Sequence, residues 1–192
     1  TLMDRYITAA QRISRLAVGT PLKVPAGHTV RIPGDRTQEK HVEGLPLGTR
    51  GGALIPYSFP RDGEYEVRMR LTRDRNEHVE GLRGESEIEL LLGDQLLQRY
   101  TIKKPDDGRQ DHVTVDRHLV YRGDFKAGPA KLGVTFPEKI APLMETRRRP
   151  FEARFNFHRH PRQNPALYQV TITGPFESSG VSETPSRKKI FV

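Results

Sequence analysis

Cysteine is absent from this sequence of 192 residues. The chain can therefore form no disulfide, no thiolate zinc site and no cysteine nucleophile. It also lacks an apolar run of the length that a membrane helix needs, and its first residues lack the apolar core of a signal peptide. We expect no membrane insertion.

The usual signatures of catalysis are missing as well. No serine stands in a nucleophile-elbow context, and the His-Glu-X-X-His motif of metalloproteases is absent. No two acidic residues stand out as the acid and base of a glycosidase. The sequence therefore predicts a domain that is not an enzyme.

The composition is polar and basic. Hydrophobic residues make up 34% of the chain and charged residues 29%, and 32 Lys and Arg against 24 Asp and Glu give a formal net charge of +8. A basic balance favours anionic partners such as nucleic acid, acidic glycans or a membrane surface, although it is equally typical of a solvated surface. The 17 glycines and 15 prolines suit short strands joined by turns.

One helix is predicted at residues 3–18. Its apolar positions recur at helical spacing, at Tyr6, Ala10, Ile13 and Ala17. Gly19 can supply the left-handed residue that ends a helix, and Pro21 prevents the helix from resuming. We expect residues 1–19 to form a helix that packs on the domain or leads into it.

After Pro21 the hydrophobic period changes to two, which predicts an antiparallel β-sandwich, jelly-roll-like, over residues 20–192. Roughly eight strands are expected by this pattern, at residues 53–59, 64–71, 88–92, 95–102, 112–120, 130–136, 151–157 and 167–173. Turn residues 60–63 and 93–94 predict two hairpins. Residues 20–49, 141–150 and 176–189 are expected to be loops or exposed connections.

A five-residue motif, His-Val-Glu-Gly-Leu, occurs at residues 41–45 and again at 78–82. Antiparallel strands between the two copies would bring both to the same rim of the sandwich. Imidazole and carboxylate groups suit a divalent metal such as calcium, with candidate ligands His41, Glu43, His78 and Glu80. The alternative is two similar loop ends, each with a glycine turn and a leucine tucked under it.

The densest turn sequence is Gly44–Gly52. Its glycines can aim successive backbone N–H groups at an anion, and Arg50 can add a bidentate donor. The segment lacks the Lys-Ser/Thr ending of a phosphate loop, so we do not expect a nucleotide site. Alternatively it is a structural loop that packs Leu45 and Leu47 inward.

Residues 155–162 combine aromatic and cationic side chains. His158, Arg159 and Arg162 can hold an anionic polymer, and histidine protonation would strengthen binding at low pH. We do not expect nucleic acid as the ligand, because it calls for basic residues interleaved with exposed aromatics over a wider area. Tyr57 and Tyr121 are the aromatics expected to line a sugar site, unless they are half-buried in the core.

Six segments together resemble a known family. They are residues 14–19, 44–52, 62–65, 156–157 with 160–162, 172–176, and 184–187 with 190–192, which include Asp62-Gly63-Glu64-Tyr65 and Ile172-Thr173-Gly174-Pro175-Phe176. This set resembles the internal domain of large planctomycete secreted proteins that are built from domains of unknown function with c-type cytochrome-like modules. The resemblance implies an exported or cell-surface parent protein with further domains on either side.

A weaker resemblance, at the level of the fold, is to jelly-roll carbohydrate-binding modules. Residues 62–68 look like the strand that opens such modules, and residues 88–94 look like their strand and turn. The chain departs from them in having no tryptophan to stack on sugars and no match to their calcium ligands. We expect a non-catalytic module that binds a polysaccharide, acidic or sulfated, with a scaffold domain that positions neighbouring modules as the alternative.

Overall fold

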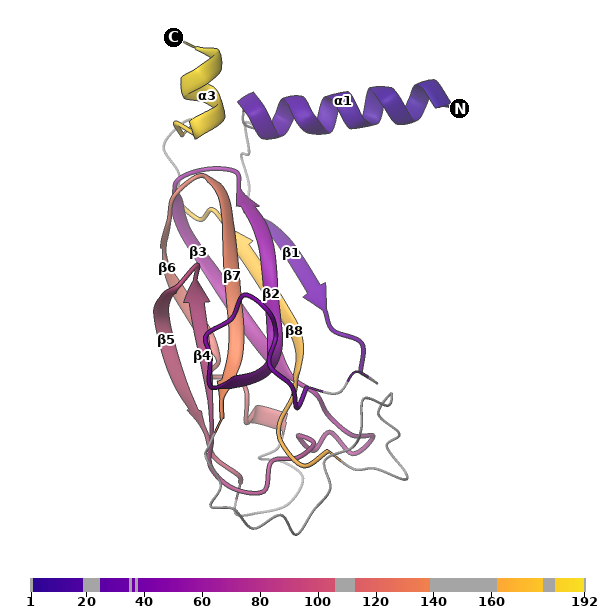
Figure 1. Cartoon of the computed structure of the whole chain (residues 1–192), viewed down its shortest axis with the longest axis vertical. Coiled ribbons are helices and arrows are strands. Elements are labelled where there is room, and N and C mark those ends of the chain that lie inside the picture. Colours follow the sequence, from indigo (N-terminus) through magenta and orange to yellow (C-terminus); the bar gives the residue numbers. More distant parts are fainter. Residues whose placement is uncertain are drawn as a thin grey trace.

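The computed structural model describes residues 2–18, 25–34, 36, 38–105, 113–138, 162–177 and 182–191. Its elements in chain order are α1 (Leu2–Val18), β1 (Ala26–Arg31), β2 (Thr49–Phe59), β3 (Gly63–Leu71), β4 (Ser86–Leu92), β5 (Gln95–Ile102), β6 (Val120–Phe125), β7 (Gly128–Pro137), β8 (Leu167–Gly174) and α3 (Pro185–Ile190). The strands form two four-stranded antiparallel sheets, sheet A in the order β1-β8-β3-β6 and sheet B in the order β2-β7-β4-β5. The predicted mainly β sandwich with an N-terminal helix is confirmed (Figure 1).

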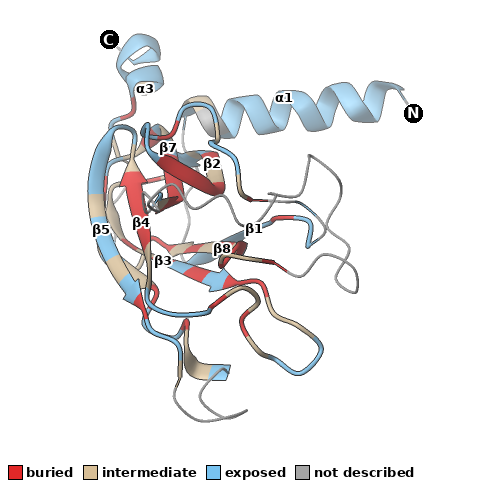
Figure 2. Cartoon of the chain, turned by 60° about the horizontal axis from the view of Figure 1, so that its bottom comes forward, coloured by how far each residue is buried: buried red, intermediate tan, exposed pale blue. Residues whose placement is uncertain are grey.

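The core lies between the two sheets, and alternation along the strands creates it. In β3, Tyr65, Val67 and Met69 are fully buried, whereas Arg68 and Arg70 between and after them are exposed. The facing side chains of sheet B include Leu90 and Val134, which are also fully buried. Figure 2 shows buried positions along β3, β4 and β7, whereas the edge strand β5 and the two helices are mostly exposed.

The predicted hairpin around Asp62-Gly63 is wrong, because its two strands lie in different sheets. β2 pairs with β7, and β3 pairs with β8 and β6. The turn therefore carries the chain from one layer to the other, where Asp62 Oδ1 accepts a hydrogen bond from the Ala127 amide at 2.7 Å. A turn signal predicts only that the chain reverses direction. The two strands beside the turn can pair within one sheet, or they can lie in two sheets that pack face to face. The second hairpin, β4–β5, is confirmed.

Three other segments differ from the sequence-based expectation. Residues 113–118 form a short helical turn and not a strand, and β6 follows it at Val120. Strand β1 lies within residues 20–49, which were expected to be loop, and it pairs with β8. Helix α3 begins within the expected connection 176–189, where the Thr184 hydroxyl accepts a hydrogen bond from the Arg187 amide as an N-cap. Residues 141–150 and 151–157 are outside the described part of the chain.

Both helices lie at one end of the sandwich (Figure 1). Arg187 Nη1 donates to the carbonyl oxygen of Val18 at 2.6 Å, which joins α3 to the end of α1. Apolar side chains of α1 are 49–69% exposed, at Leu2, Met3, Tyr6, Ile7 and Ile13. None of the described helices is long and apolar enough to cross a membrane.

Candidate functional site

The opposite end of the sandwich, which we call the loop end, gathers described residues 32–34, 36, 38–43, 72–85, 113–118 and 162–166 (Figure 1). Arg162 connects these loops. Its Nε lies 2.8 Å from Glu80 Oε2, and its guanidinium donates to the carbonyl oxygens of Arg36, at 3.0 Å, and Gly34. Arg162 therefore bonds both to the second copy of the repeated motif, at Glu80, and to the segment before the first copy, at Gly34 and Arg36.

The Arg162–Glu80 pair is buried, with only 3% and 10% of the two side chains exposed. Burial raises the pKa of Glu80, and the hydrogen bond and charge of Arg162 oppose this rise. Removing either partner would leave the other charge buried without compensation. In this structure Arg162 holds the loops together and is not on a ligand-facing surface.

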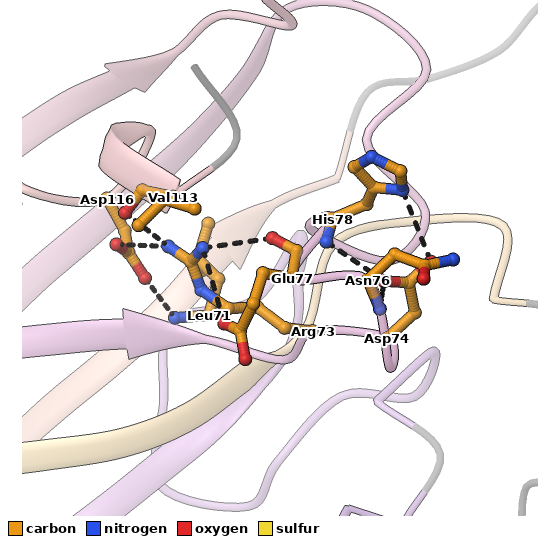
Figure 3. Close-up of polar contacts among 8 residues, drawn as sticks. All are labelled: Leu71, Arg73, Asp74, Asn76, Glu77, His78, Val113 and Asp116. Atoms are coloured by element: carbon orange, nitrogen blue, oxygen red, sulfur yellow. Dashed lines mark hydrogen bonds and ion pairs between the residues drawn. The ribbon is translucent and has the colours of Figure 1, made fainter. Parts of the chain in front are cut away.

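A second buried ion pair stabilises the loop that follows β3 (Figure 3). Arg73 Nη2 lies 2.6 Å from Asp116 Oδ1, with 9% and 5% of the side chains exposed. Asp116 Oδ2 also accepts the Leu71 amide at 3.0 Å, and Arg73 donates to the Glu77 carbonyl at 3.0 Å. The loop after β3 is thus tied to the helical turn 113–118, the segment where the sequence pattern predicted a strand.

Loop 74–78 has a fixed shape that presents polar side chains. Asp74 Oδ1 accepts the amides of Asn76 and His78 at 2.8 and 2.9 Å, and its Oδ2 lies 3.4 Å from His78 Nδ1 (Figure 3). Glu77 adopts a left-handed conformation with φ 64°. Arg75, Asn76 and Glu77 are exposed, and 35% of the His78 side chain is exposed. The loop offers amide, imidazole and carboxylate groups that can bond to hydroxyls.

Three of the four predicted metal ligands are engaged in separate interactions, and the fourth is exposed. His41 Nδ1 lies 3.4 Å from the Thr49 carbonyl, His78 contacts Asp74, Glu80 pairs with Arg162, and Glu43 is exposed. Within the described residues, no group of three or more His, Asp or Glu side chains is placed to hold a metal ion. The metal site stays a prediction, without a ligand cluster in that part of the chain.

The glycine-rich segment 44–52 has a packing role. Leu45 is 7% exposed and lies in the space that Gly133 leaves beside Leu91, but Leu47 is 91% exposed, so only the first of the two leucines packs inward. Arg50 is also buried, and it donates to the carbonyl oxygens of Gln38 and Pro165 at 3.2 and 3.1 Å. This guanidinium holds backbone in place where the sequence suggested an anion donor.

Tyr57 and Tyr121 lie at opposite edges of the sandwich. Tyr57 packs against Phe59 and His28 between the edge strands β2 and β1, with ring centroids 4.8 and 5.4 Å away, and burial raises its pKa. Tyr121, on β6 at the other edge, lies 6.0 Å from Phe125. Both rings are half-buried against the core, and the structure does not bring them together. His158 and Arg159 are outside the described residues.

One polar surface escaped the sequence reasoning, namely the outward face of sheet A. Hydrogen bonds link its side chains in a chain from Arg31 Nε to Gln169, from Gln169 Nε2 to Thr171, and between the hydroxyls of Thr171 and Thr29, at 3.3, 3.0 and 3.1 Å. Arg70 is the other cross-strand neighbour of Gln169. The alternation in β3 predicted that Arg68 and Arg70 face outward, but β1 was unrecognised, so the row could not be assembled.

Comparisons with known proteins add little. No family model matches the sequence, and no curated protein matches it. Among solved structures, the EclA C-terminal domain, described as a sugar-binding protein, has 12% identity and a TM-score of 0.31 over 77% of this chain and 78% of that chain. At these values the likeness carries no argument about function. The resemblance to planctomycete secreted proteins stays a prediction.

Proposed function

We propose that this chain is a non-catalytic carbohydrate-binding module of a larger secreted protein, and that its ligand is an acidic or sulfated polysaccharide. The observation that carries the proposal is the loop end, where loop 74–78 presents polar side chains from a backbone stabilised by two buried ion pairs, Arg73–Asp116 and Arg162–Glu80. Recognition of sugar hydroxyls needs donors and acceptors held in fixed positions, because ordering them on binding costs affinity.

The charge of the chain supports an anionic ligand. The net charge of +8 attracts a polyanion and raises its local concentration near the surface. Tyr57 and Tyr121 are half-buried on β2 and β6, so the proposed binding relies on hydrogen bonds from loop 74–78 and on the positive charge of the chain as a whole, and not on ring stacking. We therefore expect affinity to fall as salt screens exposed charges beyond about 8–10 Å.

Affinity electrophoresis in gels that contain neutral or anionic polysaccharides tests the proposal. We expect an anionic gel to retard the chain, and the double variant Asn76→Ala/His78→Ala to migrate as in an empty gel. The matched control Gln11→Ala/Gln95→Ala removes exposed polar groups from α1 and from the β4–β5 hairpin, and should be retarded like the native chain. Unaltered mobility of the native chain in every polysaccharide tested would reject the module.

A second function, a scaffold domain that positions neighbouring modules, is favoured by the helical end. There α1 and α3 lie together and expose apolar side chains, including Ile190 at 54% and Phe191 at 58%. Exposed apolar groups of this kind are typical of a surface that another module covers. Hydrogen exchange on the parent protein tests this. Slow exchange over residues 2–18 supports a covered helix, and exchange as fast as in the isolated domain contradicts it.

A further inference from the structure

A row of three side chains crosses sheet A close to the loop end. The strand register places Arg31 of β1 and Arg70 of β3 on either side of Gln169 of β8. Both arginines are exposed, whereas the alternate residues Met69 and Val170 are buried in the core. The two guanidinium groups therefore project from the same outward face, and their backbones are two strand spacings apart, about 10 Å.

These two arginines differ from the others on the same face. Arg68 is paired with Glu66 at 2.9 Å, and Arg122 is paired with Glu64 at 2.7 Å. In the part of the chain that the structure describes, neither Arg31 nor Arg70 forms an ion pair with a carboxylate. The rest of this face carries Arg68 and Arg122 against Glu64, Glu66 and Asp124, so the positive excess is confined to the row.

Hydroxyl and amide groups accompany this charge in fixed positions. Gln169 accepts from Arg31 and donates to Thr171, whose hydroxyl lies 3.1 Å from that of Thr29. These side chains stand on paired strands, so little conformational entropy remains to be lost when a ligand binds. A guanidinium recognises carboxylate and sulfate-like groups through two parallel hydrogen bonds, and hydroxyl and amide groups suit sugar hydroxyls.

The row continues the surface of the loop end. β1 ends at Arg31 and β3 ends at Leu71, so the row lies at the ends of these strands, directly before residues 32–34 and loop 72–85. The Ile32 amide donates to the Tyr168 carbonyl at 2.8 Å, which keeps the chain after β1 against β8. Asp74 follows Arg70 by only four residues, so at most about 14 Å separates their backbones, a span that a linear ligand can cover.

We propose that Arg31, Gln169 and Arg70 form an anion subsite that binds the carboxylate or sulfate groups of an acidic polysaccharide, an inference that rests on the proposed carbohydrate-binding function.

Nucleic acid is the other polyanion to consider. It would call for a wider basic surface with exposed aromatic rings for base stacking, whereas the rest of this face of sheet A carries Glu64, Glu66 and Asp124. A saccharide chain with spaced anionic groups fits a small cationic row with hydroxyl neighbours better.

The test compares two double variants that remove the same charge. Arg31→Gln/Arg70→Gln removes the row, and Arg12→Gln/Arg15→Gln removes two exposed charges from α1 at the opposite end. Titration calorimetry with heparin, polygalacturonate, neutral dextran and duplex DNA provides the binding constants, and thermal melting shows whether each variant is folded. The heparin and polygalacturonate arms separate sulfate from carboxylate recognition.

We expect the row variant to bind at least one of the two anionic polysaccharides at least about tenfold more weakly than the native chain, because each lost charged hydrogen bond costs about a factor of ten. The α1 variant should bind within about threefold of the native chain, the change expected from a distant screened charge. The variant Arg31→Lys/Arg70→Lys keeps the charge but loses the bidentate geometry, and it should bind with intermediate affinity.

Equal weakening by the row and α1 variants would overturn the subsite, because it would indicate diffuse attraction to net charge. Native affinity in the row variant would also overturn it, as would DNA binding that is as tight as polysaccharide binding and equally dependent on Arg31 and Arg70. Binding of neutral dextran alone would reject the subsite and leave the carbohydrate-binding function standing. Binding of no polysaccharide would reject the function itself.

Discussion

Replacing Arg162 with methionine tests the role of the buried ion pair at the loop end. The Arg162→Met variant leaves Glu80 buried beside an apolar side chain, since only 10% of the Glu80 side chain is exposed. Glu80 can escape its unpaired charge by taking up a proton. From a usual pKa of 4.5, this costs about 3.4 kcal/mol at pH 7, at 1.36 kcal/mol for each pH unit.

This protonation cost is the most stability that the variant can lose through the unpaired charge. Loss of the hydrogen bonds from Arg162 to the Arg36 and Gly34 carbonyls adds about 1 kcal/mol each. We therefore expect a loss of about 3–5 kcal/mol at pH 7, the range for breaking a buried pair. In a chain of this size it lowers the melting temperature by about 6–20 °C. Urea denaturation followed by circular dichroism provides the free energy of unfolding.

The same loss should depend on pH. Without Arg162 the pKa of folded Glu80 rises further above its unfolded value, so the variant loses stability as pH increases from 4.5 through the folded pKa. Below 4.5 Glu80 is protonated in both states, and the deficit shrinks to the hydrogen-bond part, about 2 kcal/mol. The double variant Glu80→Leu/Arg162→Met should recover much of the loss. A deficit below about 1 kcal/mol at pH 7, or one that is equal at pH 4 and pH 7, would refute this reasoning.

Three further predictions concern the packing of sheet B and the buried tyrosines. Gly52→Ala should lower the free energy of unfolding by well over 2 kcal/mol, because the new Cβ would lie 1.8 Å from the Val134 carbonyl oxygen at a residue with φ +81°. The control Gly48→Ala has a similar φ of +76° but no atom within 4 Å, so it should lower stability by only about 1 kcal/mol. Urea denaturation of both variants checks this. Gly133→Val should displace Leu45, whose Cδ2 lies 2.8 Å from the new Cβ position, and should lower the free energy of unfolding by about 1–3 kcal/mol. Unchanged stability would contradict this packing. Burial raises the pKa values of Tyr65 and Tyr100 to about 12, so the stability of the fold should fall as pH rises from 10 to about 12. Spectrophotometric titration of the folded chain measures these pKa values. If all six tyrosines ionise near pH 10, the prediction is wrong.

Strand β3 shows what the sequence could predict. Its alternation of apolar and charged residues indicated both the strand and its wet face, and the structure buries Tyr65, Val67 and Met69 as expected. Strand β1 lacked this signal, because it is an edge strand with no buried side chain. Periodicity detects a strand through burial of one face, so an exposed edge strand is not distinguishable from a loop.

At the loop end, the sequence revealed the repeated motif but not what joins its copies. Arg162 lies 82 residues after Glu80 and 126 after Arg36, and no local pattern indicates that the three meet. Arg50 and Arg162 were predicted to be ligand donors because arginine suits anions, and the structure uses both to satisfy buried carbonyl groups. Sequence alone does not separate a buried arginine from a surface one.

The most direct test of the proposed binding surface is an NMR titration of the isotopically labelled chain with a short heparin oligosaccharide. We predict that amide signals shift first at Arg31, Arg70 and Gln169 and in loop 74–78, while signals of α1 and α3 stay in place. Shifts confined to residues 2–18 and 185–191, or spread evenly over the basic residues, would contradict a built polysaccharide site at the loop end.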